Sequence, residues 1–200
     1  MEFYLNDSND IPDFDLGENL VNNDMTGSIL RFMENPSQDG NSIENVCDFQ
    51  SDMPVHYTSG VLNKAFTSAA RSCEANSCSG DLRECVLLLG PLFMYANIHK
   101  LTSLSGYMDS ASQTCGVIEE FYSARSPSSS CSAAQAKEFV TAGWAAVGVA
   151  IDSSCQASSL NGCVVSNVPA NAGSNALSLM ARIYAALLNI LRWMSQQFED

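Results

Sequence analysis

Apolar residues recur at three- and four-residue spacing in four separate stretches of the chain. This spacing is typical of helices that bury one face. It predicts helices at about residues 59–72, 81–98, 110–124 and 133–148. No run alternates clearly between apolar and polar residues as a half-buried strand does, and no internal repeat is visible. The pattern therefore predicts a mainly α-helical protein.

A fifth helical pattern covers the end of the chain, at about residues 175–200, and is strongly apolar. Its polar positions form one narrow stripe at helical spacing: Ser178, Arg182, Asn189, Arg192 and Gln196. The two arginines argue against a transmembrane span. We expect this amphipathic helix to dock on its own domain, on a partner or on a membrane surface.

The segments between these patterns suggest four parts. Residues 1–25 are acidic and loop-like, and residues 26–150 hold the four helical patterns. Residues 151–174 are rich in Ser, Asn and Gly, as linkers are, and residues 175–200 form the final helix.

Acidic residues are concentrated at the start of the chain. Residues 1–52 hold twelve of the 22 Asp and Glu residues and one of the nine Lys and Arg residues. The net charge of -13 argues against nucleic acid as a partner, because a phosphate backbone needs a basic face. The acidic segment suits a hard cation such as calcium, or it is simply a solvated surface.

Eight cysteines are many for 200 residues. Their even number, among Ser- and Asn-rich loops, predicts disulfides formed in an oxidising compartment. No Cys-x-x-Cys pair is present, which argues against a zinc ribbon or a thioredoxin-like motif. The first residues lack the basic start and apolar run of a signal peptide. A chain that lacks its natural beginning would reconcile the two observations.

The candidate catalytic residues do not complete a known set. The two histidines, His56 and His99, are too far apart for the H-E-x-x-H motif of zinc peptidases. His56 and Asp52 would supply two members of a serine-type triad, but the chain has no G-x-S-x-G turn. The cysteines look structural, and we expect His99 to be an ordinary surface residue.

One continuous stretch carries a family resemblance. From Arg31 to Phe66 the chain reads "RFMENPSQDGNSIENVCDFQSDMPVHYTSGVLNKAF". This resembles the segment around the second-domain active-site histidine of thermolysin-like neutral metalloproteases, especially the vibriolysin and pseudolysin branch. Three further runs resemble the same family in the same order: "DFDLGEN" (13–19), "MYANIHKLTSLSGYMDSASQTCGVI" (94–118) and "VTAGWAAVGV" (140–149). The resemblance covers about residues 11–150.

The resemblance implies a fold and an activity. Members of the family are secreted, hydrolyse peptide bonds and hold zinc in a cleft between two domains, of which the second is mostly helical. This chain resembles the second domain alone, with an irregular acidic segment before it and an extra helix after it. The zinc ligands and the general-base Glu of the family lie upstream of the matching region. A signal peptide would also lie upstream, and the chain alone is expected to be inactive.

The resemblance also implies roles for particular residues. His56 matches the histidine that donates a hydrogen bond to the oxyanion formed during peptide hydrolysis. Arg31 matches the arginine that holds a substrate carbonyl, a task that suits its planar donors, and Leu30 matches an apolar pocket wall. The family branch orients its histidine with an Asp two positions before it. Pro54 occupies that position here, so Asp52 is the candidate to replace that Asp.

Further family features map onto acidic residues and cysteines. Asp13, Asp15 and Glu18 match carboxylates of a calcium site beside the cleft. Cys115 matches a cysteine whose family partner follows the V-G-V run, and Cys155 is its candidate partner. Cys73 and Cys78 are expected to pair with each other or one of them with Cys85, and the remaining pairings stay open.

Two functions of different classes follow. In the first, the chain is the C-terminal part of a secreted zinc metalloendopeptidase, as a fragment or an incomplete reading of the gene. In the second, it is a stand-alone, catalytically dead binding module derived from such an enzyme. His56, Arg31 and the intact NPSQDG run favour the first, whereas Pro54 and the extension past residue 150 favour the second.

Overall fold

A computed structural model describes residues 13–16, 31–76, 78, 81–125, 130–160 and 162–163. The chain divides into two units, Met1–Asn167 and Val168–Asp200, and every described residue belongs to the first. The helix expected at 175–200, together with Leu30 and Glu18, lies outside the described residues.

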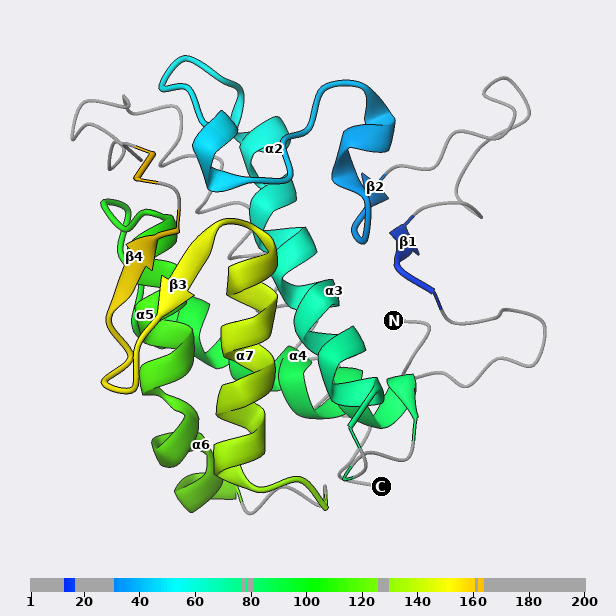
Figure 1. Cartoon of the computed structure of the whole chain (residues 1–200), viewed down its shortest axis with the longest axis vertical. Helices are drawn as coiled ribbons and strands as arrows, with labels where there is room; N and C mark the ends of the chain where they lie inside the picture. The colour runs from blue at the N-terminus through cyan, green and yellow to red at the C-terminus, as the bar shows by residue number, and fades with distance from the viewer. Residues whose placement is uncertain are drawn as a thin grey trace, which may run out of the picture. The chain divides into compact units, whose positions relative to one another are not determined.

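Five helices of eight residues or more dominate the described part, and they confirm the predicted fold class (Figure 1). They are α3 (Gly60–Glu74), α4 (Leu82–His99), α5 (Tyr107–Gly116), α6 (Ile118–Arg125) and α7 (Ala133–Ala146). Their ends lie within a few residues of the predicted ones. The third predicted helix is divided, because α5 ends at Gly116 and α6 begins after Val117.

Local signals fix where two of the helices begin. The Asp81 side chain accepts a hydrogen bond of 2.8 Å from the backbone N–H of Glu84 at the start of α4. At the start of α7, the Ser132 side chain accepts from the Gln135 N–H, and the Gln135 side chain accepts from the Ser132 N–H in return. These side chains satisfy backbone donors that a helix leaves free in its first turn.

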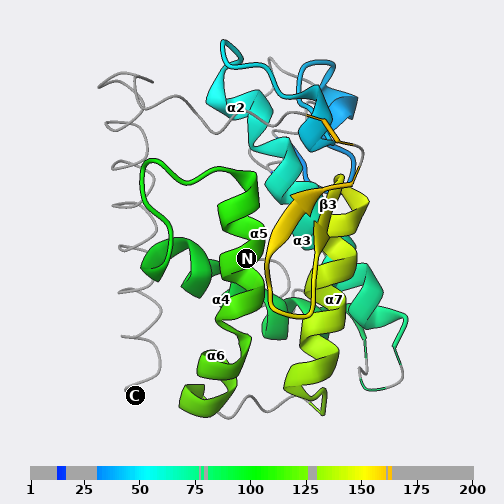
Figure 2. The ribbon, with the colours of Figure 1, turned by 60° about the vertical axis from the view of Figure 1, so that its left-hand side comes forward.

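The core forms where α3 packs along α7, as both views show (Figures 1 and 2). The largest fully buried side chains include Trp144 and Phe139 of α7 and Leu89 of α4. Gly143 allows the close approach of the two helices, because a Cβ at this position would lie 2.3 Å from the Ala65 carbonyl oxygen. Backbone contact therefore sets the distance between α3 and α7.

A hairpin follows α7 where the sequence predicted the start of a linker. Strands β3 (Val149–Ile151) and β4 (Ala157–Ser159) pair antiparallel, with Val149 opposite Ser159. Val149 and Ile151 are buried on the side of the core, whereas Ala150 between them is half-buried. The alternation is only three residues long, which is too short to stand out as a strand in the sequence. Residues 151–159 thus pack on the helical domain.

A second short ladder holds the first described residues against the domain. Strand β1 (Asp15–Leu16) pairs antiparallel with β2 (Arg31–Phe32), and Leu16 lies opposite Arg31. Two 3-10 helices follow β2, namely η1 (Pro36–Asp39) and η2 (Val46–Asp48), and the short helix α2 (Val55–Thr58) leads into α3. The run from Arg31 to Phe66, which carries the first family resemblance, therefore leads into α3 and includes its first turns (Figure 1).

All eight cysteines are paired in four disulfides: Cys47–Cys163, Cys73–Cys85, Cys78–Cys131 and Cys115–Cys155. The last is the pair that the family resemblance implied. Cys73 takes the partner Cys85, one of the alternatives left open, whereas Cys78 bonds to Cys131. Two of the four bonds attach the segment after α7 to the rest of the domain.

Peptide mapping of the non-reduced full chain, after secretory expression, is expected to recover Cys115 and Cys155 in one linked pair of peptides. The two Cα atoms lie 5.5 Å apart, within the range of native disulfides. Finding both thiols free and open to alkylation would contradict this pairing.

Within the described residues, no helix combines the length and the apolar character that crossing a membrane requires.

Candidate functional site

His56 lies on a fixed piece of backbone with its side chain exposed. Helix α2 begins after Pro54, and the hydroxyl of Thr58 donates to the Val55 carbonyl over 3.1 Å. The phenol of Tyr107 donates to the Thr58 carbonyl over 2.8 Å and so attaches α2 to α5. These contacts hold the α2 backbone while the imidazole faces solvent.

The turn into α3 is held from the other side by close packing. A Cβ on Gly60 would lie 2.4 Å from the Ile43 carbonyl oxygen. The backbone N–H of Ile43 donates to the Tyr57 carbonyl over 3.1 Å. Glycine at position 60 is thus required for the close approach of the two chain segments, and this approach fixes the position of α2.

Arg31 lies on β2 with its guanidinium anchored at one nitrogen. Its Nη1 atom donates to the Ser42 hydroxyl oxygen over 3.4 Å and forms an ion pair with Asp39 Oδ2 at 3.5 Å. The side chains of Arg31 and Asp39 are 26% and 22% exposed, so the pair is half-buried. Water is partly excluded from the pair, which weakens the screening of its attraction.

Asp39 is held by the turn that ends η1. Its Oδ1 atom accepts hydrogen bonds from the backbone N–H groups of Asn41 (2.8 Å) and Ser42 (2.6 Å), and Oδ2 accepts from the Ser42 hydroxyl (2.6 Å). Gly40 adopts a left-handed conformation with φ of 79°, which suits glycine. Burial disfavours the Asp39 carboxylate, but these hydrogen bonds and the charge of Arg31 lower the pKa of Asp39 below its ordinary value.

Glu44, a second acid in this segment, has partners different from those of Asp39. Glu44 accepts a hydrogen bond from the Ser37 N–H over 2.9 Å and forms an ion pair with Lys64 of α3. Although burial disfavours its charge, the hydrogen bonds from Lys64 and Ser37 keep the pKa of Glu44 below its ordinary value. Glu44 therefore attaches η1 to α3 and makes no contact with Arg31 among those resolved for the described residues.

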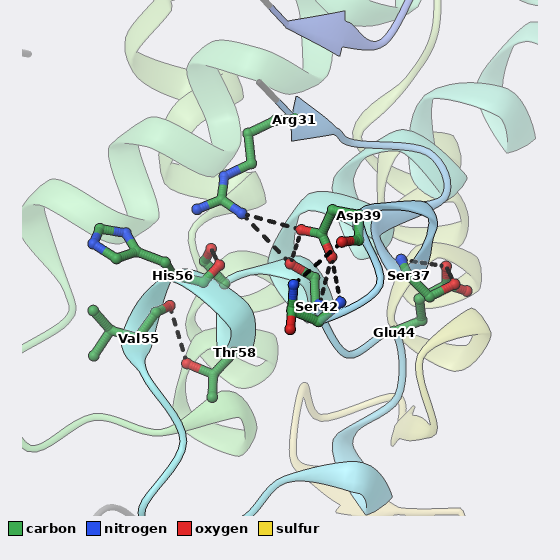
Figure 3. Close-up of polar contacts among 10 residues, drawn as sticks. Arg31, Ser37, Asp39, Ser42, Glu44, Val55, His56 and Thr58 are labelled. Carbon is green, nitrogen blue, oxygen red and sulfur yellow. Dashed lines mark hydrogen bonds and ion pairs between the residues drawn. The ribbon is translucent and has the colours of Figure 1, made fainter. Parts of the chain in front are cut away.

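Figure 3 shows the two candidate side chains, Arg31 on β2 and His56 on α2. In this view the His56 ring and the Asp39 carboxylate lie on opposite sides of the Arg31 guanidinium. The exposed Val55 side chain lies beside His56. The arrangement offers hydrogen-bond donors and one apolar side chain to a ligand in solvent.

Within the described residues, the candidates Asp52 and His99 form no hydrogen bond or ion pair with Arg31 or His56. Asp52 is exposed, and no hydrogen bond or ion pair joins it to His56 within the described residues. His99 lies exposed at the end of α4, where its ring packs against that of Tyr95, with 4.6 Å between centroids and a tilt of 42°. Leu30 is outside the described residues, so its expected place in the pocket wall remains a prediction.

Two of the three calcium candidates are described. The backbone N–H of Asp15 donates to Asp13 Oδ1 over 2.7 Å. Burial, and then the charges of Asp13 and Glu34, raise the pKa of Asp15. A nearby cation would relieve this repulsion. Glu34, however, already pairs with Arg71 at 2.9 Å, and Glu18 lies outside the described residues.

The described part of the chain does not fit a zinc centre. Zinc in a hydrolase takes three protein ligands from His, Cys or carboxylate side chains. Among residues 13–16, 31–76, 78, 81–125, 130–160 and 162–163, no three such side chains are grouped to hold an ion. All cysteines are in disulfides.

Comparison with known families identifies the class of protein that this helical domain represents. The sequence profile described as "Thermolysin metallopeptidase, alpha-helical domain" matches residues 1–149. Because this match covers most of the 200 residues, the chain belongs to the family of thermolysin metallopeptidase α-helical domains.

Individual relatives match over shorter stretches. The chain is 38% identical over 71 residues to the "Neutral protease" of Vibrio proteolyticus, covering 34% of this chain and 11% of that protein. It is 39% identical over 51 residues to the "Zinc metalloproteinase" of Legionella pneumophila, covering 26% and 9%. It is 49% identical over 37 residues to the "Zinc metalloproteinase MspA" of Legionella longbeachae, covering 18% and 7%. The matched part spans about a tenth of the length of these relatives.

The two side chains that contact the Arg31 guanidinium, Asp39 and Ser42, were not predicted from the sequence. Asp39 and Ser42 belong to the run "DGNS", which was part of the family resemblance, yet neither was assigned a role. The signal was a turn with an acid and a hydroxyl residue three positions apart, a spacing at which both side chains meet across a tight turn.

Proposed function

We propose that this chain is the C-terminal helical part of a secreted zinc metalloendopeptidase and provides two groups that bind the reacting peptide. The observation that carries the proposal is a pair of hydrogen-bond donors on fixed backbone, the exposed His56 imidazole and the half-buried Arg31 guanidinium. The family assignment supports it independently.

The proposed roles follow from the charge that develops during peptide hydrolysis. Attack on the scissile carbonyl produces a tetrahedral oxyanion, and hydrogen-bond donors aimed at that oxygen stabilise the transition state. In our proposal His56 donates to the oxyanion. Arg31 donates to a neighbouring carbonyl of the substrate, where its planar donors hold the peptide in register.

The proposed function places the zinc site and the calcium site on different parts of the polypeptide. In our proposal, the zinc ligands and the general base come from a part equivalent to the other domain of the family. We propose a calcium ion for Asp13, Asp15 and Glu18, because carboxylate oxygens are the ligands that calcium prefers.

Secretion is supported by the cysteines. Four disulfides in 200 residues are stable in an oxidising environment, such as the outside of a cell, and are rare in a reducing cytosol.

The full chain purified alone is expected to hold no catalytic zinc and to leave casein uncleaved. When it is joined to a zinc-loaded thermolysin-type N-terminal domain, the pair is expected to cleave casein, and a chelator should abolish the cleavage. Metal analysis and a proteolysis assay on the chain, the N-terminal domain and the joined protein test both statements. The proposal that another domain supplies the zinc ligands would be contradicted if the chain alone cleaved casein, a chelator stopped the cleavage and His56→Ala abolished it.

A second candidate function is an inactive peptide-binding module. The observation in its favour is that His56 lacks a carboxylate partner, since Pro54 replaces the family's Asp and Asp52 makes no bond to the ring within the described residues. In this case the joined protein would bind peptide without cleaving it. The proteolysis assay above separates the two candidates.

A further inference from the structure

We propose that Asp39 is a positioning residue for peptide binding, because it fixes the orientation of the Arg31 guanidinium through an ion pair and through Ser42. The inference rests on the proposed function and extends it to a side chain that would not touch the substrate. It assigns a role to the turn that ends η1, in which the run "DGNS" (39–42) lies beside Arg31.

The anchor acts on one corner of the guanidinium. Nη1 of Arg31 is 3.4 Å from the Ser42 hydroxyl oxygen and 3.5 Å from Asp39 Oδ2. Asp39 and Ser42 are themselves joined, because the Ser42 hydroxyl donates to Asp39 Oδ2 over 2.6 Å. The three side chains form a closed triangle (Figure 3), so rotation of the guanidinium must break at least one of its contacts.

The base of this triangle is rigid. Asp39 Oδ1 accepts from two consecutive backbone N–H groups, those of Asn41 and Ser42. Ser42 is only 6% exposed. The backbone N–H of Gly40 donates to the Ser37 carbonyl over 2.9 Å and closes the turn. A carboxylate held by backbone in this way does not swing with its own side-chain torsions.

In our proposal, the opposite edge of the guanidinium binds the ligand. Among the contacts of the described residues, Nη1 alone of the three Arg31 nitrogens has a partner. In the view of Figure 3 the other terminal nitrogen points away from Asp39, toward the side where the His56 ring lies. An anchored guanidinium donates to a carbonyl without first losing the freedom of several rotatable bonds.

The test compares two carboxylates of similar exposure. Asp39→Asn keeps an oxygen for the backbone N–H groups of the turn but removes the charge that faces Arg31. Glu44→Gln is the matched control, since Glu44 pairs with Lys64 at the same 22% exposure. A third variant, Ser42→Ala, removes the hydroxyl of the triangle. The full chain is used throughout, with acetyl-Gly-Leu-amide as the peptide probe.

Two quantities are measured by NMR. The first is the rotation rate of the Arg31 guanidinium about its Cζ–Nε bond without ligand. The second is the dissociation constant of the probe. We expect both Asp39→Asn and Ser42→Ala to raise the rotation rate of the guanidinium. Asp39→Asn should also weaken probe binding about tenfold, because the Arg31 guanidinium would no longer be oriented toward the probe carbonyl. Glu44→Gln should change neither quantity by more than about twofold.

The outcomes separate this inference from the proposed function. An unchanged rotation rate in Asp39→Asn, or a change as large in Glu44→Gln, overturns the positioning role. Faster rotation with unchanged probe affinity also overturns it, because orientation then has no effect on binding. If the unsubstituted chain does not bind the probe, the proposed function fails together with the inference that depends on it, whatever the rotation rates show.

Discussion

Replacing His56 with alanine should reduce kcat of the joined protein by about 10²–10³-fold, the cost of removing one donor to an oxyanion. KM should change little, because the oxyanion exists in the transition state and not in the bound substrate. The residue lies exposed on α2, whose backbone is held by Thr58 and Tyr107, so truncation of the ring leaves the surrounding contacts intact.

The second histidine provides the control for this experiment. His99 is also exposed, but it lies at the end of α4 and packs against the Tyr95 ring. His99→Ala should leave kcat within about twofold of the unsubstituted protein, in contrast to the effect of removing an oxyanion donor. If His56→Ala were as active as the unsubstituted protein, the proposed role of His56 in the reaction would be contradicted.

Replacing Gly143 with valine should lower the free energy of unfolding by about 3 kcal/mol or more. Even the first carbon of a side chain would lie 2.3 Å from the Ala65 carbonyl oxygen and 2.7 Å from the Ala69 Cβ. Because the nearest atom belongs to the backbone of α3, relief requires the two helices to separate. Urea unfolding with the disulfides intact measures the change, with the slope expected to stay constant.

A second helical glycine supplies the comparison. Nothing lies within 4 Å of a Cβ built on Gly116, at the end of α5. Gly116→Ala should therefore be neutral or stabilise the protein by up to about 1 kcal/mol, since alanine favours helix. If Gly143→Val unfolds at the same urea concentration as the unsubstituted protein, the close approach of α3 and α7 at Gly143 is contradicted.

The helices of this protein were largely predictable because each carries its own signal. In α3, Val61, Ala65 and Ala69 recur at four-residue spacing and are fully buried. Such local periodicity follows from helix geometry alone. The β3–β4 hairpin was not foreseen, because its three-residue strands depend on packing against distant elements: the Ala157 N–H donates to the Ser112 hydroxyl of α5 over 3.0 Å.

Two of the disulfide pairs were also not predicted, because they join residues that only the fold brings together. Cys47 and Cys163 are 116 positions apart, and no local pattern connects them. The partner of Cys78 was also unforeseen, because Cys131 approaches it only through the folding of the helical domain.

The sequence names candidate residues for the site but does not reveal which side chains hold them in place. His56 and Arg31 were identified because both occur in one run that resembles the family segment. That run does not reveal which acid faces which cation, since Asp39 and Glu44 are both acids of the same run. Their distances to Arg31 and Lys64 distinguish them.

The central claim is that the face with His56 and Arg31 binds the peptide, and an NMR titration of the full chain with acetyl-Gly-Leu-amide tests it most directly. We expect the ring resonances of His56 and the Nε–H resonance of Arg31 to shift together and to fit a single dissociation constant. The claim would be contradicted if neither resonance moved, or if the shifts were confined to the open groove that Lys137, Thr141 and Ile151 line beside α7.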